Sequence, residues 1–422
     1  MKFGTFLIGA TILLIIIIVG VSYRTGSIAE DLHMSGVKKR KAGDLDGAIA
    51  DFDKAIRMIP TIWQFYSDRA VARSAKGDRD GAIADYSRVI NLSPKEPFAY
   101  ANRGLEREGK GDLAGAISDA SYAISLDPNY AWGYYVRGDA KDLTGDTEGS
   151  IADLDKAIQY DPTARGFYCS RAITRSKMGD RDGAIADCSK AIELAPSSAL
   201  AYDMRGDLRR EGGDLEAAIA DYDKAIELDP TDWSIHTSRA RARWMERDLE
   251  RGLADCNLVI QRDPGNASAH SLRGYLEYDQ HAWREALDDF RKACELEHSG
   301  PPREYVRLRI WLIRSRLGER EDATKELAQY LSSRPQNDWY SKNAKFLVGQ
   351  LSESEYFQAA QSTIPKTQTE QSCEAWFYAG TVRLLDGDRK TAAAYFQKCL
   401  DTGVKRFTES MSAEAELKAL GK

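Results

Sequence analysis

The sequence predicts an all-α protein in which helix hairpins repeat in tandem and stack on one another, behind a single N-terminal membrane helix. Nearly the same phrase occurs twice: GDRDGAIADYSRVINLSP begins at Gly77, and GDRDGAIADCSKAIELAP begins at Gly179. The 102 residues between them are three periods of 34, because Gly-Asp pairs also begin at Gly111 and Gly145. The third observation is an uncharged apolar run that starts directly after Lys2.

The N-terminal segment 1–24 is predicted to be a membrane anchor. Phe3 to Tyr23 is a run of 21 residues without a charge, and a helix needs about 20 apolar residues to cross the hydrocarbon core. Neither a small-x-small cleavage site nor a lipid-accepting cysteine follows it. We therefore favour an uncleaved single-pass anchor, and a cleaved signal peptide is the alternative.

The basic residues beside this run leave its orientation open. Arg24 and the basic run 38–41 outnumber Lys2, which by the positive-inside rule favours a cytoplasmic C-terminal part. Only two residues precede the long apolar run, as in a signal anchor, and this favours export of the C-terminal part instead. We expect a bacterial inner-membrane protein with its repeats in the periplasm, and the cytoplasmic side stays open.

The composition of the chain excludes several classes of protein. The sequence is 43% hydrophobic and 29% charged, which is typical of folded rather than disordered chains. Its formal net charge of −6 argues against nucleic acid as a partner, because phosphate binding needs a basic face. Six cysteines without a C-x-x-C pair predict neither a disulfide scaffold nor a zinc site.

Each 34-residue period reads as helix, short turn, helix and stop. In the copy around Gly179, this glycine can end the first helix in a left-handed cap, and Asp180 or Asp182 can cap the second. Pro196 prevents the second helix from continuing. The apolar positions of that second helix fall on one stripe: Ala184, Ile185, Cys188, Ala191 and Ile192. Because one hairpin cannot bury its own stripe, neighbouring hairpins must stack.

This pattern resembles the tetratricopeptide repeat (TPR), with aromatic, small and proline positions in phase. One copy matches the family pattern throughout: Tyr202, Gly206, Gly213, Ala218, Tyr222, Ala225 and Pro230. The resemblance implies a right-handed α-solenoid whose concave face is lined by the first helices. It assigns eight TPR units to 29–300, a ninth TPR-like unit to 304–337, a degenerate helical segment to 338–372, and a terminal TPR-like unit plus capping helix to 373–420. The C-terminal end is similar to that of envelope TPR adaptor proteins, although this chain lacks their lipidated cysteine.

No motif predicts catalysis or a cofactor. The segment GLEREGKG, from Gly104 to Gly111, begins like a phosphate-binding loop. Gly111 stands where serine or threonine should bind magnesium, and the segment falls within a predicted helix. The five histidines form no metal-ligand or triad spacing. We therefore expect no enzyme, no nucleotide, no metal and no cofactor, and an enzyme with an unrecognised site remains a minor alternative.

Two columns of opposite charge follow the period. We interpret them as a structural ion-pair ladder, because an arginine on the first helix should lie level with an aspartate on the second helix of a hairpin. The alternative is a basic stripe for an acidic ligand. The arginines are Arg69, Arg103, Arg137, Arg171, Arg205, Arg239 and Arg273, and the aspartates are Asp51, Asp85, Asp119, Asp153, Asp187, Asp221, Asp255 and Asp289.

The positions that the resemblance places on the concave groove vary from copy to copy, as expected of a surface that the fold does not dictate. Aromatic side chains flanked by acids suit a peptide with apolar anchors and basic residues. The candidate set is Phe98, Trp132, Tyr135, Asp139, Asp142, Asp203, Asp207, Trp244, Tyr275, Tyr278 and Tyr305. The predicted function is therefore a membrane-anchored scaffold or adaptor that binds a protein or peptide. A solvated groove without a ligand, or a self-associating structural subunit forming homo-oligomers, are the alternatives.

Cys373 and Cys399 are a candidate disulfide. They begin the first helix and end the second helix of the predicted terminal hairpin, so antiparallel packing brings them together. The bridge requires an oxidising compartment. Otherwise both are small packing residues.

Overall fold

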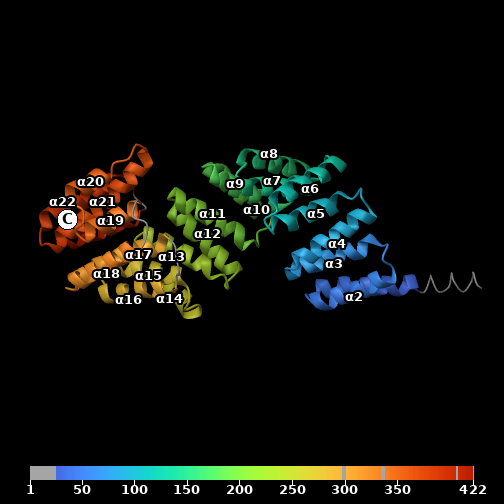
Figure 1. The fold of residues 1–422 in the computed structure, drawn as a ribbon, viewed down its shortest axis with the longest axis horizontal. Helices are drawn as coiled ribbons and strands as arrows, with labels where there is room; N and C mark the ends of the chain where they lie inside the picture. The colour runs from blue at the N-terminus through green and yellow to red at the C-terminus, as the bar shows by residue number, and fades with distance from the viewer. Residues whose placement is uncertain (1–24, 297–300, 334–337, 405–406, 422) are drawn as a thin grey trace, which may run out of the picture. The chain divides into compact units, whose positions relative to one another are not determined.

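The computed structural model describes residues 25–296, 301–333, 338–404 and 407–421, without the side chains of 301–303. Every regular element in these ranges is a helix, which confirms the predicted all-α class. The chain divides into two compact units, with the boundary between Pro196 and Ser197. Figure 1 shows the helix hairpins of both units.

The N-terminal unit consists of helix pairs in which each helix packs on the next. A helix over 25–41 comes first. The others are α2 (Leu45–Met58), α3 (Trp63–Lys76), α4 (Arg79–Leu92), α5 (Pro97–Glu108), α6 (Leu113–Leu126), α7 (Ala131–Thr144), α8 (Thr147–Tyr160), α9 (Arg165–Lys177) and α10 (Arg181–Leu194).

The C-terminal unit continues the hairpins and then departs from the period. It contains α11 (Ala199–Gly212), α12 (Leu215–Leu228), α13 (Trp233–Met245), α14 (Leu249–Arg262), α15 (Ala267–Asp279), α16 (Trp283–Leu296), α17 (Pro301–Arg316), α18 (Arg320–Ser332), α19 (Trp339–Leu347), α20 (Glu353–Ala359), α21 (Pro365–Leu385), α22 (Arg389–Asp401) and α23 (Thr408–Ala419). The 34-residue phase is lost around the short helices α19 and α20, and a hairpin returns with α21 and α22.

Local capping sets the ends of the helices. The side chain of Asp180 accepts a hydrogen bond from the backbone N–H of Gly183 at 3.0 Å, so Asp180 rather than Asp182 caps α10. The same bond recurs at the start of α4, α6, α8 and α12. Gly179, with φ of +82°, takes the left-handed conformation that reverses the chain between α9 and α10.

Two repeats lack this glycine. Arg247 and His281 occupy the positions 34 and 68 residues after Gly213, with φ of +69° and +62°. They are the only residues other than glycine with positive φ in the described ranges. The left-handed conformation costs an L-residue roughly 1–2 kcal/mol, so these two turns are strained relative to the others.

Small residues allow the two helices of a hairpin to approach closely. A Cβ added to Gly206 would lie 2.7 Å from the Tyr222 ring, and Tyr222 itself is fully buried beside Ala218 and Ala225. The aromatic ring of the second helix thus fills the space that the glycine of the first helix leaves open.

The sequence predicts that the terminal helix caps the open end of the repeats. In the structure this helix also packs against earlier hairpins. Helix α23 packs against α22 and α21 and also reaches α15, three hairpins earlier. Glu414 of α23 also binds Arg247, which lies 167 residues earlier in the turn between α13 and α14, and no local pattern predicts such a contact.

The predicted anchor, Phe3 to Tyr23, lies outside the described residues. Among the residues that the structure does describe, no helix combines the length and apolar character needed to cross a membrane.

Candidate functional site

The first helices of the N-terminal unit carry a strip of aromatic side chains. The rings of Trp132 and Tyr135 of α7 pack in a tilted arrangement at 4.8 Å between centroids, and Tyr135 stacks on Phe167 of α9 at 5.1 Å. The Trp132 indole also donates a hydrogen bond to Asn102 Oδ1 of α5 at 3.2 Å. The strip therefore runs across α5, α7 and α9, on the surface that the first helices share. We call this surface the first-helix face of the N-terminal unit.

The predicted residue Phe98 lies further toward the N-terminus. Its ring packs on Trp63 of α3 at 5.3 Å, and it is partly buried against the neighbouring core. Phe98 therefore belongs as much to the packing between α3 and α5 as to an exposed surface.

An acidic depression adjoins the aromatic strip. Its volume is about 230 Å³. It is lined by Glu108, Asp139, Asp142, Leu143, Ser170, Ile173 and Lys177. Leu143 and Ile173 keep 56% and 45% of their surfaces exposed, so the depression combines carboxylates with accessible aliphatic side chains.

The carboxylates of this depression are incompletely paired. Lys177 Nζ lies 2.5 Å from Asp142 Oδ2. Asp142 Oδ1 and Glu108 Oε2 are buried and have no hydrogen-bond partner among the described residues. Burial and the charge of Asp139 raise the pKa of Glu108 to about 7, and burial also raises the pKa of Asp139. A cation placed here would stabilise the charged form of both groups.

Asp203 and Asp207 lie on α11, in the C-terminal unit. Asp207 accepts hydrogen bonds from the Tyr222 hydroxyl at 2.7 Å and from Arg210 at 2.9 Å. Burial and the neighbouring Asp207 raise the pKa of Asp203 to about 6. Asp207 is therefore engaged within the unit, whereas Asp203 Oδ1 has no hydrogen-bond partner in the described chain.

The other four predicted groove residues do not form an open surface. Trp244 and Tyr278 are each only 1% exposed. Trp244 belongs to a buried cluster with Met411 of α23. The expectation that these two side chains line an accessible groove is corrected here: α23 occupies the surface formed by the first helices of this unit. Tyr275 packs between Trp244 and Phe290, and Tyr305 packs on Tyr340 of α19.

The arginine and aspartate columns are in direct contact in seven hairpins, whereas Asp51 of the first hairpin is bound by Lys39 at 2.6 Å and Ser35 at 2.7 Å. Each of the seven arginines binds the aspartate 16 residues later through Nε and Nη2, with N···O distances of 2.5–3.0 Å. The bound aspartate side chains are only 4–7% exposed. Parallel bonds of this kind hold the two helices of a hairpin in register.

A second cation follows each of the first six arginines by four residues. It binds the same aspartate at 2.7–2.8 Å. These second cations are Arg73, Arg107, Lys141, Arg175, Arg209 and Arg243. The guanidinium groups are thus committed to buried carboxylates and do not form a stripe for an acidic ligand.

One hairpin breaks this second column, which the sequence reading overlooked. Glu277 stands where the cation is expected, and burial together with the carboxylate of Asp289 raises its pKa to about 8. The ring of His270 lies 2.8 Å from Asp289 and replaces the missing cation as its partner. The sequence contains the signal for this exception, because Glu277 interrupts a column of arginine and lysine residues spaced by 34.

The structure bears on two of the candidate motifs, the metal-ligand clusters and the segment from Gly104 to Gly111. No group of three or more His, Cys, Asp or Glu side chains in these ranges could hold a metal ion. Gly104 is inside α5 and Gly111 forms the turn after it, with φ of +84°, so the segment between them is not a phosphate-binding loop.

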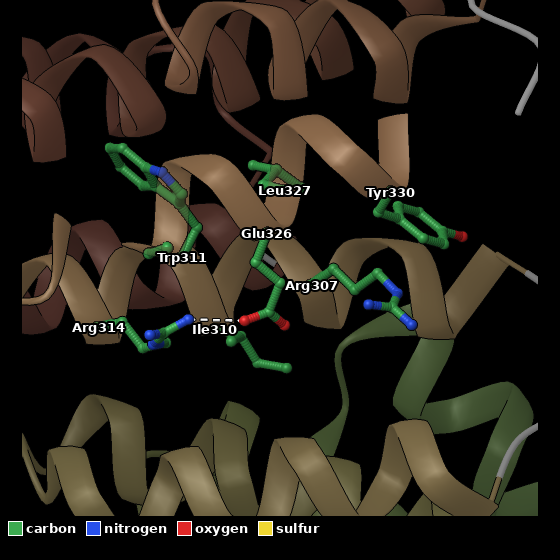
Figure 2. A pocket seen from close by; sticks show the side chains of 8 residues that line it. Arg307, Ile310, Trp311, Arg314, Glu326, Leu327 and Tyr330 are labelled. Carbon is green, nitrogen blue, oxygen red and sulfur yellow. Dashed lines mark hydrogen bonds and ion pairs between the residues drawn. The ribbon is translucent and has the colours of Figure 1, made fainter. Parts of the chain in front are cut away.

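A small cavity and the predicted cysteine pair complete the set of candidate sites. Figure 2 shows a cavity between α17 and α18, of about 10 Å³, across which Arg314 and Glu326 form an ion pair at 2.6 Å. This volume holds at most one water molecule. Cys373 and Cys399 are buried free thiols with sulfur atoms 3.2 Å apart.

Comparisons with known proteins identify the repeats. Family models described as TPR repeat or tetratricopeptide repeat match residues 206–245, 35–97, 133–163 and 166–198. A search of curated proteins found no match.

Several solved structures are similar to parts of this chain. The Cut9–Hcn1 hetero-tetramer of APC/C is 11% identical with a TM-score of 0.50, covering 62% of this chain and 52% of that one. A TPR protein from Parabacteroides merdae is 21% identical with a TM-score of 0.44, covering 60% and 98%. YrrB, described as a TPR protein with an unusual peptide-binding site, is 19% identical with a TM-score of 0.38, covering 44% and 96%. At such identities the likeness concerns the fold alone.

Proposed function

We propose that this chain, which is a tetratricopeptide repeat protein, is a non-catalytic scaffold that binds a protein partner through the first-helix face of its N-terminal unit. The ligand we infer is a peptide segment with apolar side chains and at least one lysine or arginine. The apolar side chains would pack on Trp132 and Tyr135, and the basic one would enter the acidic depression.

One observation carries this proposal. Buried oxygens of Glu108 and Asp142 have no partner among the described residues, directly beside exposed Leu143 and Ile173. An unpartnered buried carboxylate oxygen costs free energy that a ligand cation can recover. Neighbouring aromatic rings supply the kind of contact that dominates most peptide interfaces.

The proposal includes a membrane tether, on the strength of the sequence alone. Phe3 to Tyr23 would hold the repeats at a bacterial inner membrane, on the periplasmic side. Membrane fractions should contain the chain with Met1 to Tyr23 attached, whereas a soluble mature form beginning near Ser27 would contradict it. Proximity labelling with the label at the C-terminus would give both the partner and the side of the membrane.

The binding surface is tested with variants once such a partner is isolated. Trp132→Ala and Tyr135→Ala should each weaken binding by about 1–4 kcal/mol, and Asp142→Asn should weaken it most at low salt. Tyr122→Ala is the matched control, because Tyr122 is an exposed aromatic on the second helix α6. Equal binding by all these variants would place the interface elsewhere, and a chain that sediments as an oligomer without a partner would favour the structural-subunit alternative.

A further inference from the structure

Helix α23 packs across other helices of the C-terminal unit, among them α15 and α21. Six residues separate its first residue, Thr408, from the end of α22 at Asp401. One side of α23 is buried, and Glu414 and Lys418 of the other side are exposed. The buried side consists of Glu409, Ser410, Met411, Ser412, Ala413, Glu416 and Leu417.

Polar contacts join α23 to the first helices, beside the apolar packing of Met411, Ala413 and Leu417. Ser412 donates to Asp279 of α15 at 2.7 Å and accepts from Arg309 of α17 at 3.2 Å. Arg309, which is fully buried, also binds Glu409 at 3.2 Å. Leaving one member of a buried polar pair without its partner is costly, so these contacts select a helix whose polar side chains match Asp279 and Arg309.

A second charged contact repeats the first one two turns along α23. Arg316 of α17 binds Glu416 at 2.5 Å. Glu409 and Glu416 are seven residues apart and therefore lie on the same side of the helix. The two arginines of α17 are likewise seven apart, so α17 and α23 match in charge and spacing.

The two strained turns both face α23. Arg247 donates to Asp279 at 3.1 Å, to Glu414 at 2.6 Å and to the backbone carbonyl of Met411. His281 lies 3.8 Å from Glu416. The repeat pattern places glycine at these positions, and the chain departs from it in the two hairpins whose turns reach α23. The strain at Arg247 and His281 is thus accompanied by contacts to the terminal helix.

We propose that the surface formed by α13, α15, α17 and α21 is a helix-binding groove, and that α23 is its resident, displaceable and autoinhibitory ligand. The groove accepts a helix with two carboxylates seven residues apart around small side chains, in place of α23. The proposal deepens the scaffold function and rests on it, since it describes a second binding surface of the same protein.

The linker between α22 and α23 sets how strongly α23 should weaken the binding of another peptide to the groove. A short linker holds α23 at an effective concentration on the order of 1 mM. A peptide that binds the empty groove with a Kd of about 10 µM would therefore bind the intact chain about 100-fold more weakly.

The first experiment uses a fluorescent peptide with the sequence of Thr408 to Ala419, titrated with the full chain and followed by anisotropy. Ala413→Pro in the full chain breaks α23 and should bind the peptide at least about 30-fold more tightly than the parent. Lys418→Ala, on the exposed side, should behave as the parent does. A folded Ala413→Pro chain that does not bind the peptide, or a parent that binds it equally well, overturns the proposal.

A second measurement covers the case in which Ala413→Pro fails to fold. Arg247→Ala keeps a side chain in the same strained turn but removes the bonds to α23. It should accelerate amide hydrogen exchange in α23 at least about 10-fold, without a change in α22. Arg251→Ala is the control, since Arg251 is 75% exposed in the same hairpin. Unchanged or jointly accelerated exchange in α23 and α22 would show a fixed structural helix. Neither experiment involves the N-terminal unit, so a failure here leaves the proposed partner surface standing.

Discussion

The ladder arginine Arg103 offers the sharpest test of what holds a hairpin together. It binds Asp119 through Nε at 2.8 Å and through Nη2 at 2.7 Å, and the Asp119 side chain is only 7% exposed. Arg103→Leu replaces the guanidinium with a shorter apolar side chain and removes both bonds, together with the bond that Nη1 donates to Ser87 Oγ at 3.1 Å. A buried carboxylate is then left with Arg107 alone, which binds its Oδ2 at 2.8 Å.

The magnitude follows from these contacts. Two hydrogen bonds between charged groups are together worth roughly 3–6 kcal/mol, and removing one partner of a buried pair costs about 3–5 kcal/mol. Because Arg107 still compensates part of the charge of Asp119, we expect the opening free energy of this hairpin to fall by about 2–4 kcal/mol. Repeats contact only their neighbours, so the loss should be confined to α5, α6 and the adjoining helices.

Amide hydrogen exchange measures this local free energy directly. Exchange in α5 and α6 should accelerate about 30- to 1000-fold, with α21 and α22 unchanged. Lys110→Ala is the control, because the Lys110–Asp80 pair in the same region is exposed and should contribute little. Arg103→Leu combined with Asp119→Leu should recover part of the loss, since no carboxylate is left buried and Arg107, whose side chain is 28% exposed, remains accessible to water. The reasoning is refuted if Arg103→Leu behaves like Lys110→Ala, or if the double variant is no more stable than the single one.

Three further predictions concern other parts of the chain. The pKa of Glu277 is raised from 4.5 to about 8, so the folded chain should lose stability as pH rises between these values. Glu277→Gln should then raise the melting temperature at about pH 9 but not at about pH 4, and equal melting curves at high pH would disprove this. Oxidation should join Cys373 to Cys399, with a gain of about 3–4 kcal/mol from the closed loop, and full thiol labelling of the unreduced, denatured chain would show that no bridge forms. Asp112→Ala removes the cap that accepts from Gly115 at 2.9 Å and should cost about 0.5–2 kcal/mol in urea unfolding, a cost that Asp112→Asn should largely avoid.

Much of this protein follows from local rules that operate within one repeat. Helix ends were predictable because Asp180 and Gly179 act through bonds to residues at most five positions away. The contact of Arg103 with Asp119 was predictable as well, because a two-helix hairpin of known length brings residues 16 apart to the same level. The aromatic strip at Trp132 and Tyr135 could be placed on the first helices from the period alone.

Only the tertiary structure shows that the first-helix surface of the C-terminal unit is covered. Trp244 and Tyr278 have the same periodic signature as the residues of the N-terminal unit, yet both are buried. The helix that covers this surface contacts it through bonds such as Ser412 to Asp279, across 133 residues. Periodicity constrains which side of a helix faces its neighbours in the stack. It carries no information about α23, which packs outside the period. That contact depends on tertiary packing between segments that are far apart in the sequence.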